Sequence, residues 1–144
     1  WEYAARNGGQ DITHPWGDEE ATCEYAVMFG YGQGIDDPYG CGLHHTWAVC
    51  SKPAGNTEHG LCDMAGNVFE YVRDWYRESY VGAPSDGSAW NDVSTLPNTY
   101  RGGSWDSIPD YLRATNRFGK THETVTEFNA GADCLGFRCA RGGE

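Results

Sequence analysis

The sequence lacks the features that would assign it to a membrane or to nucleic acid. No apolar run approaches the roughly 18 residues that a membrane-spanning helix needs. Basic residues are scarce: ten Lys and Arg stand against 21 Asp and Glu, and the formal net charge is −11. Because phosphate binding requires clustered positive charge, this balance argues against nucleic acid and anionic membrane surfaces as partners.

Common catalytic motifs are also missing. The sequence contains no glycine-rich phosphate loop, no GxSxG elbow and no CxxC pair. Its five histidines show neither HxxxH nor HExxH spacing. His44 and His45 are adjacent, so that on a strand their side chains would face opposite sides. We therefore expect solvated histidines in loops and no catalytic metal centre built from them.

Glycine, aromatic residues and cysteine are abundant instead. With 20 Gly, six Trp and nine Tyr in 144 residues, the composition predicts one turn-rich domain anchored by large aromatic side chains. The six cysteines are even in number, and disulfides in an exported protein explain that number best. We therefore expect an extracellular, periplasmic or cell-surface location. The pairing of the cysteines cannot be deduced from their spacing.

The order of elements predicts a sheet with much irregular structure. Residues 1–6 read as the end of a helix, stopped by Asn7-Gly8-Gly9. Residues 30–42 are rich in glycine and without periodicity. The expected strands are 24–29, 46–50, 67–76, 100–105, 111–117 and 135–141. A long loop is expected between the last two strands, and the fold class expected is α+β with antiparallel strands.

The segment 60–76, GLCDMAGNVFEYVRDWY, combines a turn with an aromatic strand. Gly66-Asn67 is a turn dipeptide, and Glu70 follows three residues after the asparagine. A side-chain amide, a carboxylate and turn carbonyls are oxygen donors of the kind that calcium prefers. The segment therefore predicts one structural calcium ion, bound by the Asn67 amide, the Glu70 carboxylate and the carbonyls of Gly66 and Val68.

This segment and four others resemble one family. The others are WEYAAR at 1–6, HPWG at 14–17, YRGGSW at 100–105 and LGFRC at 135–139. Together they resemble the formylglycine-generating enzyme (sulfatase-modifying factor) family, which implies a C-type-lectin-like α+β fold. In that family a first half precedes the tryptophan. The resemblance thus implies that residues 1–144 are one domain portion, the C-terminal part, with another segment or chain supplying the missing half.

The resemblance also bears on catalysis. Enzymes of this family use copper held by two thiolates shortly after the glycine-glycine-serine motif. Here Ser107 stands at the place of the first cysteine and Leu112 near that of the second. Neither side chain binds Cu(I), which prefers soft thiolates, so we expect no copper and no formylglycine chemistry. A similar short GGSW form occurs in iron-dependent sulfoxide synthases, whose iron-binding histidines lie on a separate helical domain.

Position in the family pattern suggests disulfide pairs. Cys23 and Cys41 stand in loops that supply calcium ligands elsewhere in the family, which favours a Cys23–Cys41 bridge. Cys50 and Cys62 would then close the loop 51–61. The alternatives for the last two cysteines are a Cys134–Cys139 bridge or a bridge from Cys139 to the missing half.

The leading hypothesis is a non-catalytic, exported binding or structural module with a protein or glycan ligand. Related domains serve as ligand-binding variable proteins of diversity-generating retroelements, which is one alternative; the other is a metal-dependent oxidoreductase or sulfatase-maturation enzyme with ligands in the absent half. The resemblance places the ligand-binding residues from the end of the GGSW motif onward; packing into the domain's own core is their other role. They are Trp105, Asp106, Ser107, Tyr111, Asn116 and Phe118.

Overall fold

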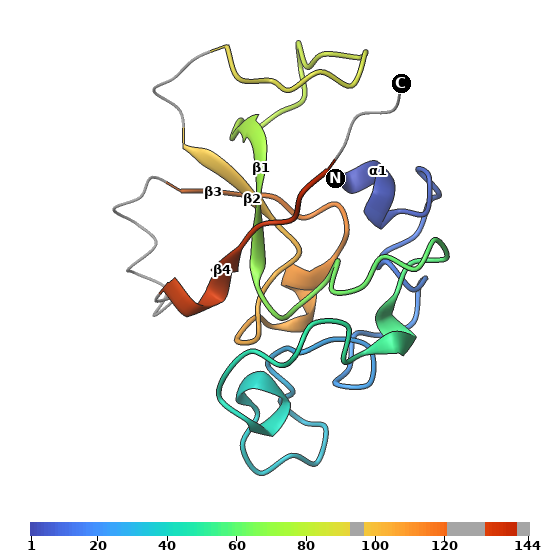
Figure 1. Cartoon of the computed structure of the whole chain (residues 1–144), viewed down its shortest axis with the longest axis vertical. Helices are drawn as coiled ribbons and strands as arrows, with labels where there is room; N and C mark the ends of the chain where they lie inside the picture. Colours follow the sequence, from blue (N-terminus) through green and yellow to red (C-terminus); the bar gives the residue numbers. More distant parts are fainter. Residues whose placement is uncertain (93–96, 121–131, 141–144) are drawn as a thin grey trace.

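The computed structural model describes residues 1–92, 97–120 and 132–140. Its regular part is a four-stranded sheet in the order β3-β2-β1-β4, surrounded by loops and short helices (Figure 1). β2 pairs antiparallel with β1 and with β3, as expected, whereas β4 runs parallel to β1. The strands are β1 Phe69–Trp75, β2 Asn98–Arg101, β3 Phe118–Lys120 and β4 Leu135–Gly136.

The helices of the described residues are short. The predicted helix at the start of the chain is confirmed as α1, Glu2–Ala5, and the chain leaves it through Asn7 and Gly8, both with positive φ angles. The 3₁₀ helices are η1 Tyr39–Gly42, η2 Pro53–Gly55, η3 Pro109–Leu112 and η5 Ala132–Cys134.

β1 is the strand that the sequence predicts best. Its aromatic and β-branched residues place Tyr71 opposite Tyr100 on one face, with ring centroids 4.6 Å apart. The adjacent pair, Glu70 opposite Arg101, lies on the other face because successive side chains alternate. The two faces of the sheet are therefore different: one is aromatic, and the other carries charged residues toward α1.

Three expected strands are wrong. In 24–29 the N–H groups of Tyr25 and Ala26 donate to the Thr22 carbonyl, which makes a turn. In 46–50 the backbone of Trp47 is bonded to a side chain instead of a neighbouring strand. In 111–117 the chain continues from η3, whose first residue is Pro109; proline has no N–H for a sheet and favours the first turn of a helix.

Two small hydrophobic clusters form the core. One contains Met28 and Leu112, with Trp16 and the Cys23–Cys41 pair packed around it. The second contains Met64 and Ala114, with Trp1 packed against it. Most core positions thus come from loops and η3, and the loops are held by these buried contacts rather than by strand pairing.

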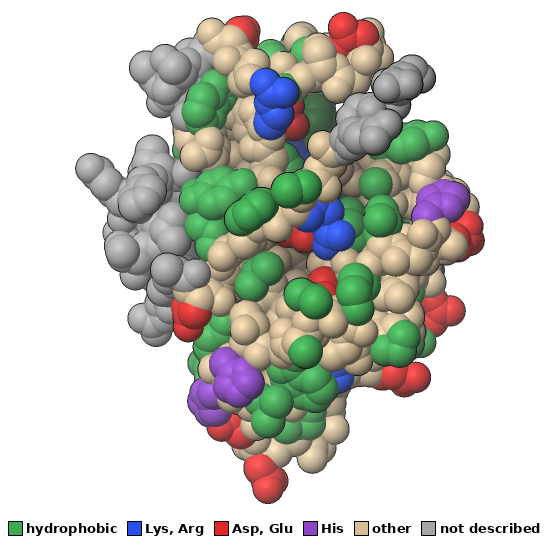
Figure 2. Space-filling view, viewed as in Figure 1, with side chains coloured by type: hydrophobic (Ala, Val, Ile, Leu, Met, Phe, Trp, Pro, Cys, Tyr) green, Lys and Arg blue, Asp and Glu red, His purple; other side chains and the backbone are tan. Residues whose placement is uncertain are grey.

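The surface is dominated by acidic and neutral side chains. Acidic side chains lie along the lower and right-hand edges of the face in Figure 2, with hydrophobic side chains between them. Within the described ranges, no helix has the length and apolar character needed to cross a membrane.

Candidate functional site

The chain turns after β2 at Gly102 and Gly103, and this turn shapes the candidate site. Both residues have positive φ angles, +90° and +76°, which glycine adopts at little cost. A Cβ atom on Gly103 would lie 3.0 Å from Leu112 Cδ1 and 3.4 Å from Ser107 Cβ. The turn therefore brings Ser107 and Leu112 to one place beside the Gly103 backbone.

The polar groups at this place are buried and bind one another. Ser104 Oγ donates to Asp106 Oδ1 at 2.6 Å, and Ser107 Oγ accepts the Ser104 N–H at 2.9 Å. Ser107 is only 4% exposed, and Leu112 is fully buried next to it. The two positions expected to lack thiolates thus present a hydrogen-bonded hydroxyl and an alkyl group.

Cys134 lies against the same cluster, within hydrogen-bonding reach of Ser104 and Asp106. Burial raises the pKa of its thiol to about 12, and the nearby carboxylates act in the same direction. The thiol therefore stays protonated at neutral pH, which makes it a poor nucleophile and metal ligand.

The predicted Cys134–Cys139 bridge is wrong. Both cysteines are free: Cys134 is buried in η5, whereas Cys139 is exposed after β4. A thiol that faces the interior and one that faces solvent cannot meet without moving the backbone. A bridge from Cys139 to a segment outside this chain stays a prediction.

Asn67, a predicted calcium ligand, is the centre of a hydrogen-bonded turn. Its amide oxygen accepts the Trp47 N–H at 2.9 Å, and its amide nitrogen donates to the Trp47 carbonyl at 3.3 Å. Its own backbone N–H donates to the Val27 carbonyl, and its carbonyl accepts the Trp105 N–H. Asn67 therefore joins separate loops: its side chain holds the backbone at Trp47, and its own backbone holds those at Val27 and Trp105.

Glu70, the second predicted side-chain ligand, forms a buried ion pair. Arg138 donates to both carboxylate oxygens at 2.6 to 2.9 Å, and Trp1 Nε1 donates at 2.6 Å. Beside it, the Gly66 carbonyl accepts the Val68 N–H at 2.9 Å. A guanidinium thus lies next to Glu70, so that calcium could bind this carboxylate only if Arg138 moved away. The calcium site therefore stays a prediction, and it requires that Arg138 moves away from Glu70.

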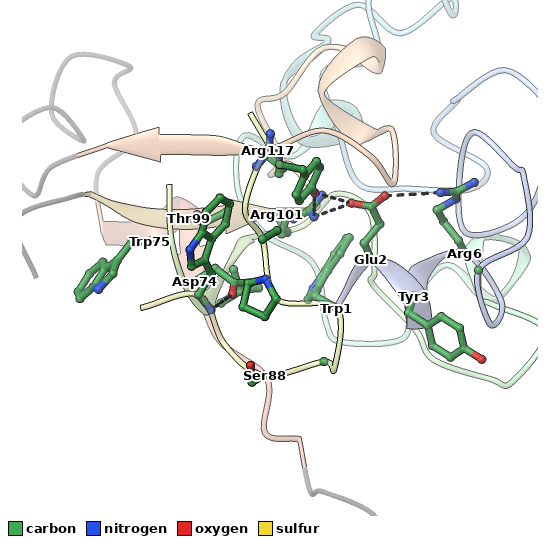
Figure 3. Close-up of a pocket in the computed structure, with 17 residues that line it drawn as sticks. Trp1, Glu2, Tyr3, Arg6, Asp74, Trp75, Ser88, Thr99, Arg101 and Arg117 are labelled. Atoms are coloured by element: carbon green, nitrogen blue, oxygen red, sulfur yellow. Dashed lines mark hydrogen bonds and ion pairs between the residues drawn. The ribbon is translucent and has the colours of Figure 1, made fainter. Parts of the chain in front are cut away.

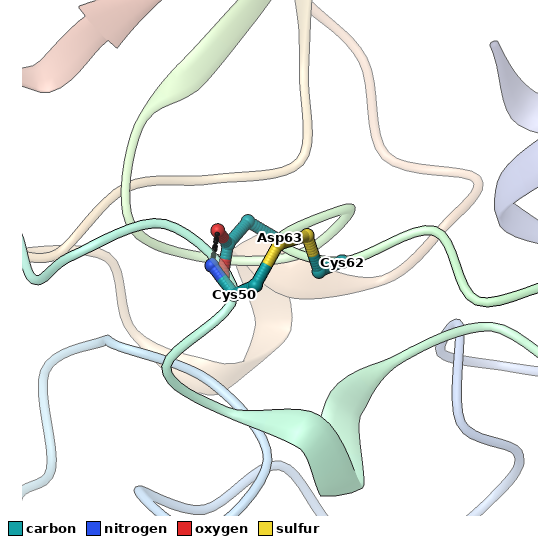
Figure 4. Close-up of side chains that lie close together, drawn as sticks. All are labelled: Cys50, Cys62 and Asp63. Carbon is teal, nitrogen blue, oxygen red and sulfur yellow. Dashed lines mark hydrogen bonds between the residues drawn. A yellow bond between two sulfur atoms is a disulfide. The ribbon is translucent and has the colours of Figure 1, made fainter.

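The structure forms both disulfides that the family pattern suggested. Cys23–Cys41 and Cys50–Cys62 join residues separated by 18 and 12 positions. Asp63 lies beside the second bridge and accepts the Cys50 N–H at 2.7 Å (Figure 4). Although these side chains lie close enough together to surround an ion, the sulfurs are bonded to each other and offer no thiolate.

The six predicted ligand-binding residues do not form one open surface. Ser107 is interior, which makes its predicted role wrong. Tyr111 and Phe118 pack edge to face with ring centroids 5.0 Å apart, and Phe118 packs in the same way on Phe69 at 5.2 Å. The other half-buried members are Trp105, Asp106 and Asn116. The exposed side chains of this segment are those of Ile108, Asp110, Arg113 and Thr115. The rings of Tyr111 and Phe118 therefore pack inside the domain, beneath these exposed side chains. The expected loop continues into residues 121–131, which lie outside the described residues.

A cavity of ≈440 Å³ lies between α1, the segment 80–90 and the charged face of β1 and β2 (Figure 3). Sequence reasoning missed it: although several of its residues belong to the segments 1–6, 60–76 and 100–105, nothing in the sequence indicates that these distant segments surround one cavity. The one sequence feature that relates to it is arginine: Arg6, Arg101 and Arg117 line it, in a chain with few basic residues.

The comparison with known families decides the assignment. The family described as the sulfatase-modifying factor enzyme 1-like domain, which is the formylglycine-generating-enzyme family, matches residues 1–142. The chain belongs to this family.

Relatives of the domain differ in their named activities. The chain is 31% identical to the serine/threonine-protein kinase pkn1 of Chlamydia caviae over 99% of the chain and 20% of that protein. It is 31% identical to the inactive C-alpha-formylglycine-generating enzyme 2 of Bos taurus (99% of the chain, 42% of that protein). It is 29% identical to the formylglycine-generating enzyme of Streptomyces coelicolor (97% and 44%). The chain thus spans less than half of each of these relatives.

Solved structures agree on the fold. PvdO from Pseudomonas aeruginosa superposes with a TM-score of 0.67 and 33% identity, over 83% of this chain and 43% of PvdO. Variable protein 1 of Treponema denticola gives a TM-score of 0.59 and 29% identity, over 84% and 39%. The predicted C-type-lectin-like α+β fold of the formylglycine-generating-enzyme family is therefore confirmed.

Proposed function

We propose that this domain is a non-catalytic binding or structural module of the formylglycine-generating-enzyme family. The observation that carries the proposal is the environment of Ser107 and Leu112. Both converge beside Gly103, both are buried, and the Ser107 hydroxyl is bonded to the Ser104 backbone. Copper-dependent oxidation of a cysteine needs two soft ligands at one metal, and this place supplies one sulfur, the buried and protonated thiol of Cys134.

The experiment compares the protein with a variant that restores sulfur. Purified protein, Cu(I), oxygen and a cysteine-containing sulfatase peptide are incubated, and formylglycine is measured by mass spectrometry. We expect no turnover. The double variant Ser107→Cys with Leu112→Cys is the matched control and should gain Cu(I) affinity in competition with bicinchoninate, because its two sulfurs would share one place. Turnover by the unaltered protein would overturn the proposal.

We further propose that the module works outside the cytoplasm and contacts a protein or glycan through the surface above η3. This surface consists of the exposed side chains of Ile108, Asp110, Arg113 and Thr115. Two disulfides support an oxidising compartment. The packed rings of Tyr111 and Phe118 support a rigid surface, since such packing fixes the residues above it. Mass spectrometry of protein isolated without reduction from its natural compartment tests the location: both bridges should be intact, and reduced Cys23, Cys41, Cys50 or Cys62 would contradict export.

A second candidate is a ligand-binding variable protein, favoured by the likeness to variable protein 1 of Treponema denticola. It predicts that gene copies from sister isolates differ at exposed positions of this segment, such as Ile108 and Arg113, and agree at Gly103, Ser107 and Leu112. Equal variation at buried and exposed positions would exclude it. The enzymatic alternative places metal ligands outside these 144 residues, and activity assays on a longer protein that contains this domain test it.

A further inference from the structure

The cavity beside α1 is separate from the Ser107 and Leu112 region and does not depend on the proposal made for that region. Its floor is the charged face of the sheet, with Val72 and Asp74 from β1 and Thr99 and Arg101 from β2. One wall is α1, and the other is the segment 80–90, which includes Tyr80 (Figure 3). At ≈440 Å³ the cavity has the size typical of sites for small molecules.

Positive charge gathers in this cavity although the chain is strongly acidic. Arg6, Arg101 and Arg117 line it together with two carboxylates, Glu2 and Asp74. Both carboxylates already have partners: Glu2 lies 2.6 Å from Arg101 and 3.5 Å from Arg6, and Asp74 accepts a backbone N–H at 2.7 Å. The lining therefore carries one more positive than negative charge. The terminal N–H groups of Arg101 are already engaged by Glu2, Tyr80 and the carbonyls of Ala114 and Asn116. Arg117, whose guanidinium has no such partner among the described residues, is the group that can receive an anion.

The lining also contains buried donors without acceptors. Arg6 Nε and Arg101 Nε are buried, and within the described part of the chain neither has a hydrogen-bond partner. The Arg101 side chain is only 7% exposed. Both atoms carry N–H groups and can only donate. Neither is reached by solvent, so a ligand acceptor would contact them only after these side chains shift.

Aromatic rings hold the guanidinium groups in place. Arg117 lies 3.9 Å from the centroid of the Tyr80 ring, and Arg101 lies 5.5 Å from that of Trp1. A guanidinium stacked on a ring keeps its N–H donors in its own plane, where a carboxylate can accept two of them. The rings also offer flat apolar walls, and Trp90 adds another.

We propose that this cavity binds a small planar anion: a carboxylate attached to an aromatic or similarly flat ring. The carboxylate accepts from the Arg117 guanidinium, and the ring lies between the aromatic walls. A net positive charge, the guanidinium of Arg117 and flat apolar surfaces occur together here, and a neutral ligand of the same shape would satisfy only the last of them.

The experiment uses 2-naphthoate as the probe and its neutral isostere 2-naphthamide as the comparison, with affinities measured by titration calorimetry. Tryptophan fluorescence reports binding as a second signal, because Trp1, Trp75 and Trp90, three of the six tryptophans, line the cavity. We expect naphthoate to bind at least about tenfold more tightly than the amide, which corresponds to about 1.4 kcal/mol. Higher salt should weaken naphthoate binding and leave amide binding unchanged.

Two variants test the location. Arg117→Gln should weaken naphthoate binding about tenfold, whereas Arg73→Gln, an exposed arginine outside the cavity, changes the net charge equally and should leave the affinity within about twofold. Ala83→Phe should reduce binding by filling space in the cavity without removing charge, which keeps the test valid if Arg117→Gln unfolds. Absence of naphthoate binding, equal binding of acid and amide, or equal losses in the two arginine variants would overturn the proposal.

Discussion

Removing the charge of Glu70 should destabilise the fold strongly, whether or not calcium is present. The carboxylate side chain is 6% exposed and accepts bonds from Arg138 and Trp1, whereas the Arg138 side chain is 31% exposed. Glu70→Gln leaves a guanidinium half-buried without its counterion, and Arg138→Gln leaves a carboxylate almost wholly buried. The second change should therefore cost more than the first.

The size of each loss follows from this asymmetry. Breaking a buried ion pair by removing one partner costs about 3 to 5 kcal/mol. Because water reaches part of Arg138, we expect about 3 kcal/mol for Glu70→Gln and about 4 kcal/mol for Arg138→Gln. For a domain of this length the smaller loss lowers Tm by roughly 10 °C. The double variant removes both charges, so its loss should fall short of the sum by about 1 to 3 kcal/mol.

Urea unfolding followed by tryptophan fluorescence measures all four proteins of this double-mutant cycle. Losses below about 0.5 kcal/mol, the level of ordinary surface substitutions, or a coupling near zero would refute the reasoning. The same cycle with added calcium tests the metal prediction. If calcium binds Glu70, its presence should raise the Tm of the unaltered protein, and more so that of Arg138→Gln, because the metal no longer competes with a guanidinium.

Three further predictions concern single side chains. At pH 8, Ellman titration should find one fast thiol, Cys139, and a second, Cys134, only after unfolding, since burial raises the pKa of Cys134 to about 12; four or more thiols would contradict the two bridges. Asn67→Ala should cost about 2 to 3 kcal/mol in urea unfolding with or without calcium, because two hydrogen bonds to the Trp47 backbone are lost; a loss confined to calcium-containing buffer would favour a metal ligand instead. Burial alone would raise the pKa of Glu2, but the hydrogen bond and charge of Arg101 outweigh it and hold that pKa below the usual 4.5. Ionised Glu2 therefore stabilises the fold above that value and loses this effect as the pH falls through its lower folded pKa, so Glu2→Gln should flatten the decline of Tm below pH 4.5, and an unchanged decline would contradict it.

Sequence reasoning succeeded where the physical requirement is local. β1 was predicted within two residues at its start, because its aromatic and β-branched residues follow a turn dipeptide. The short helix at the start was also correct, since Asn7 and Gly8 end it with positive φ angles. Both elements are determined by residues that are neighbours in the chain.

It failed where partners are distant. The segment 111–117 has the residue types of a strand, yet η3 forms because Pro109 favours a helical turn and Leu112 is drawn into the core. Glu70 has the chemistry of a calcium ligand, and only the fold reveals Arg138 as its partner. The cavity was missed for the same reason: the composition shows that basic residues are few, and only the arrangement of α1, β2 and the chain before β3 brings three arginines together.

The family resemblance therefore concerns the backbone, whereas the chemistry depends on the side chains that the backbone carries. In the GGSW turn Gly102 and Gly103 have positive φ angles, and residues 107 and 112 converge beside Gly103. What changes is the pair of groups placed there, and a buried hydroxyl with an alkyl group cannot perform soft-metal chemistry. A motif that specifies backbone geometry thus predicts a fold well and an activity poorly. The activity must be argued from the groups that the backbone presents, which here are the surface above η3 and the arginine-lined cavity.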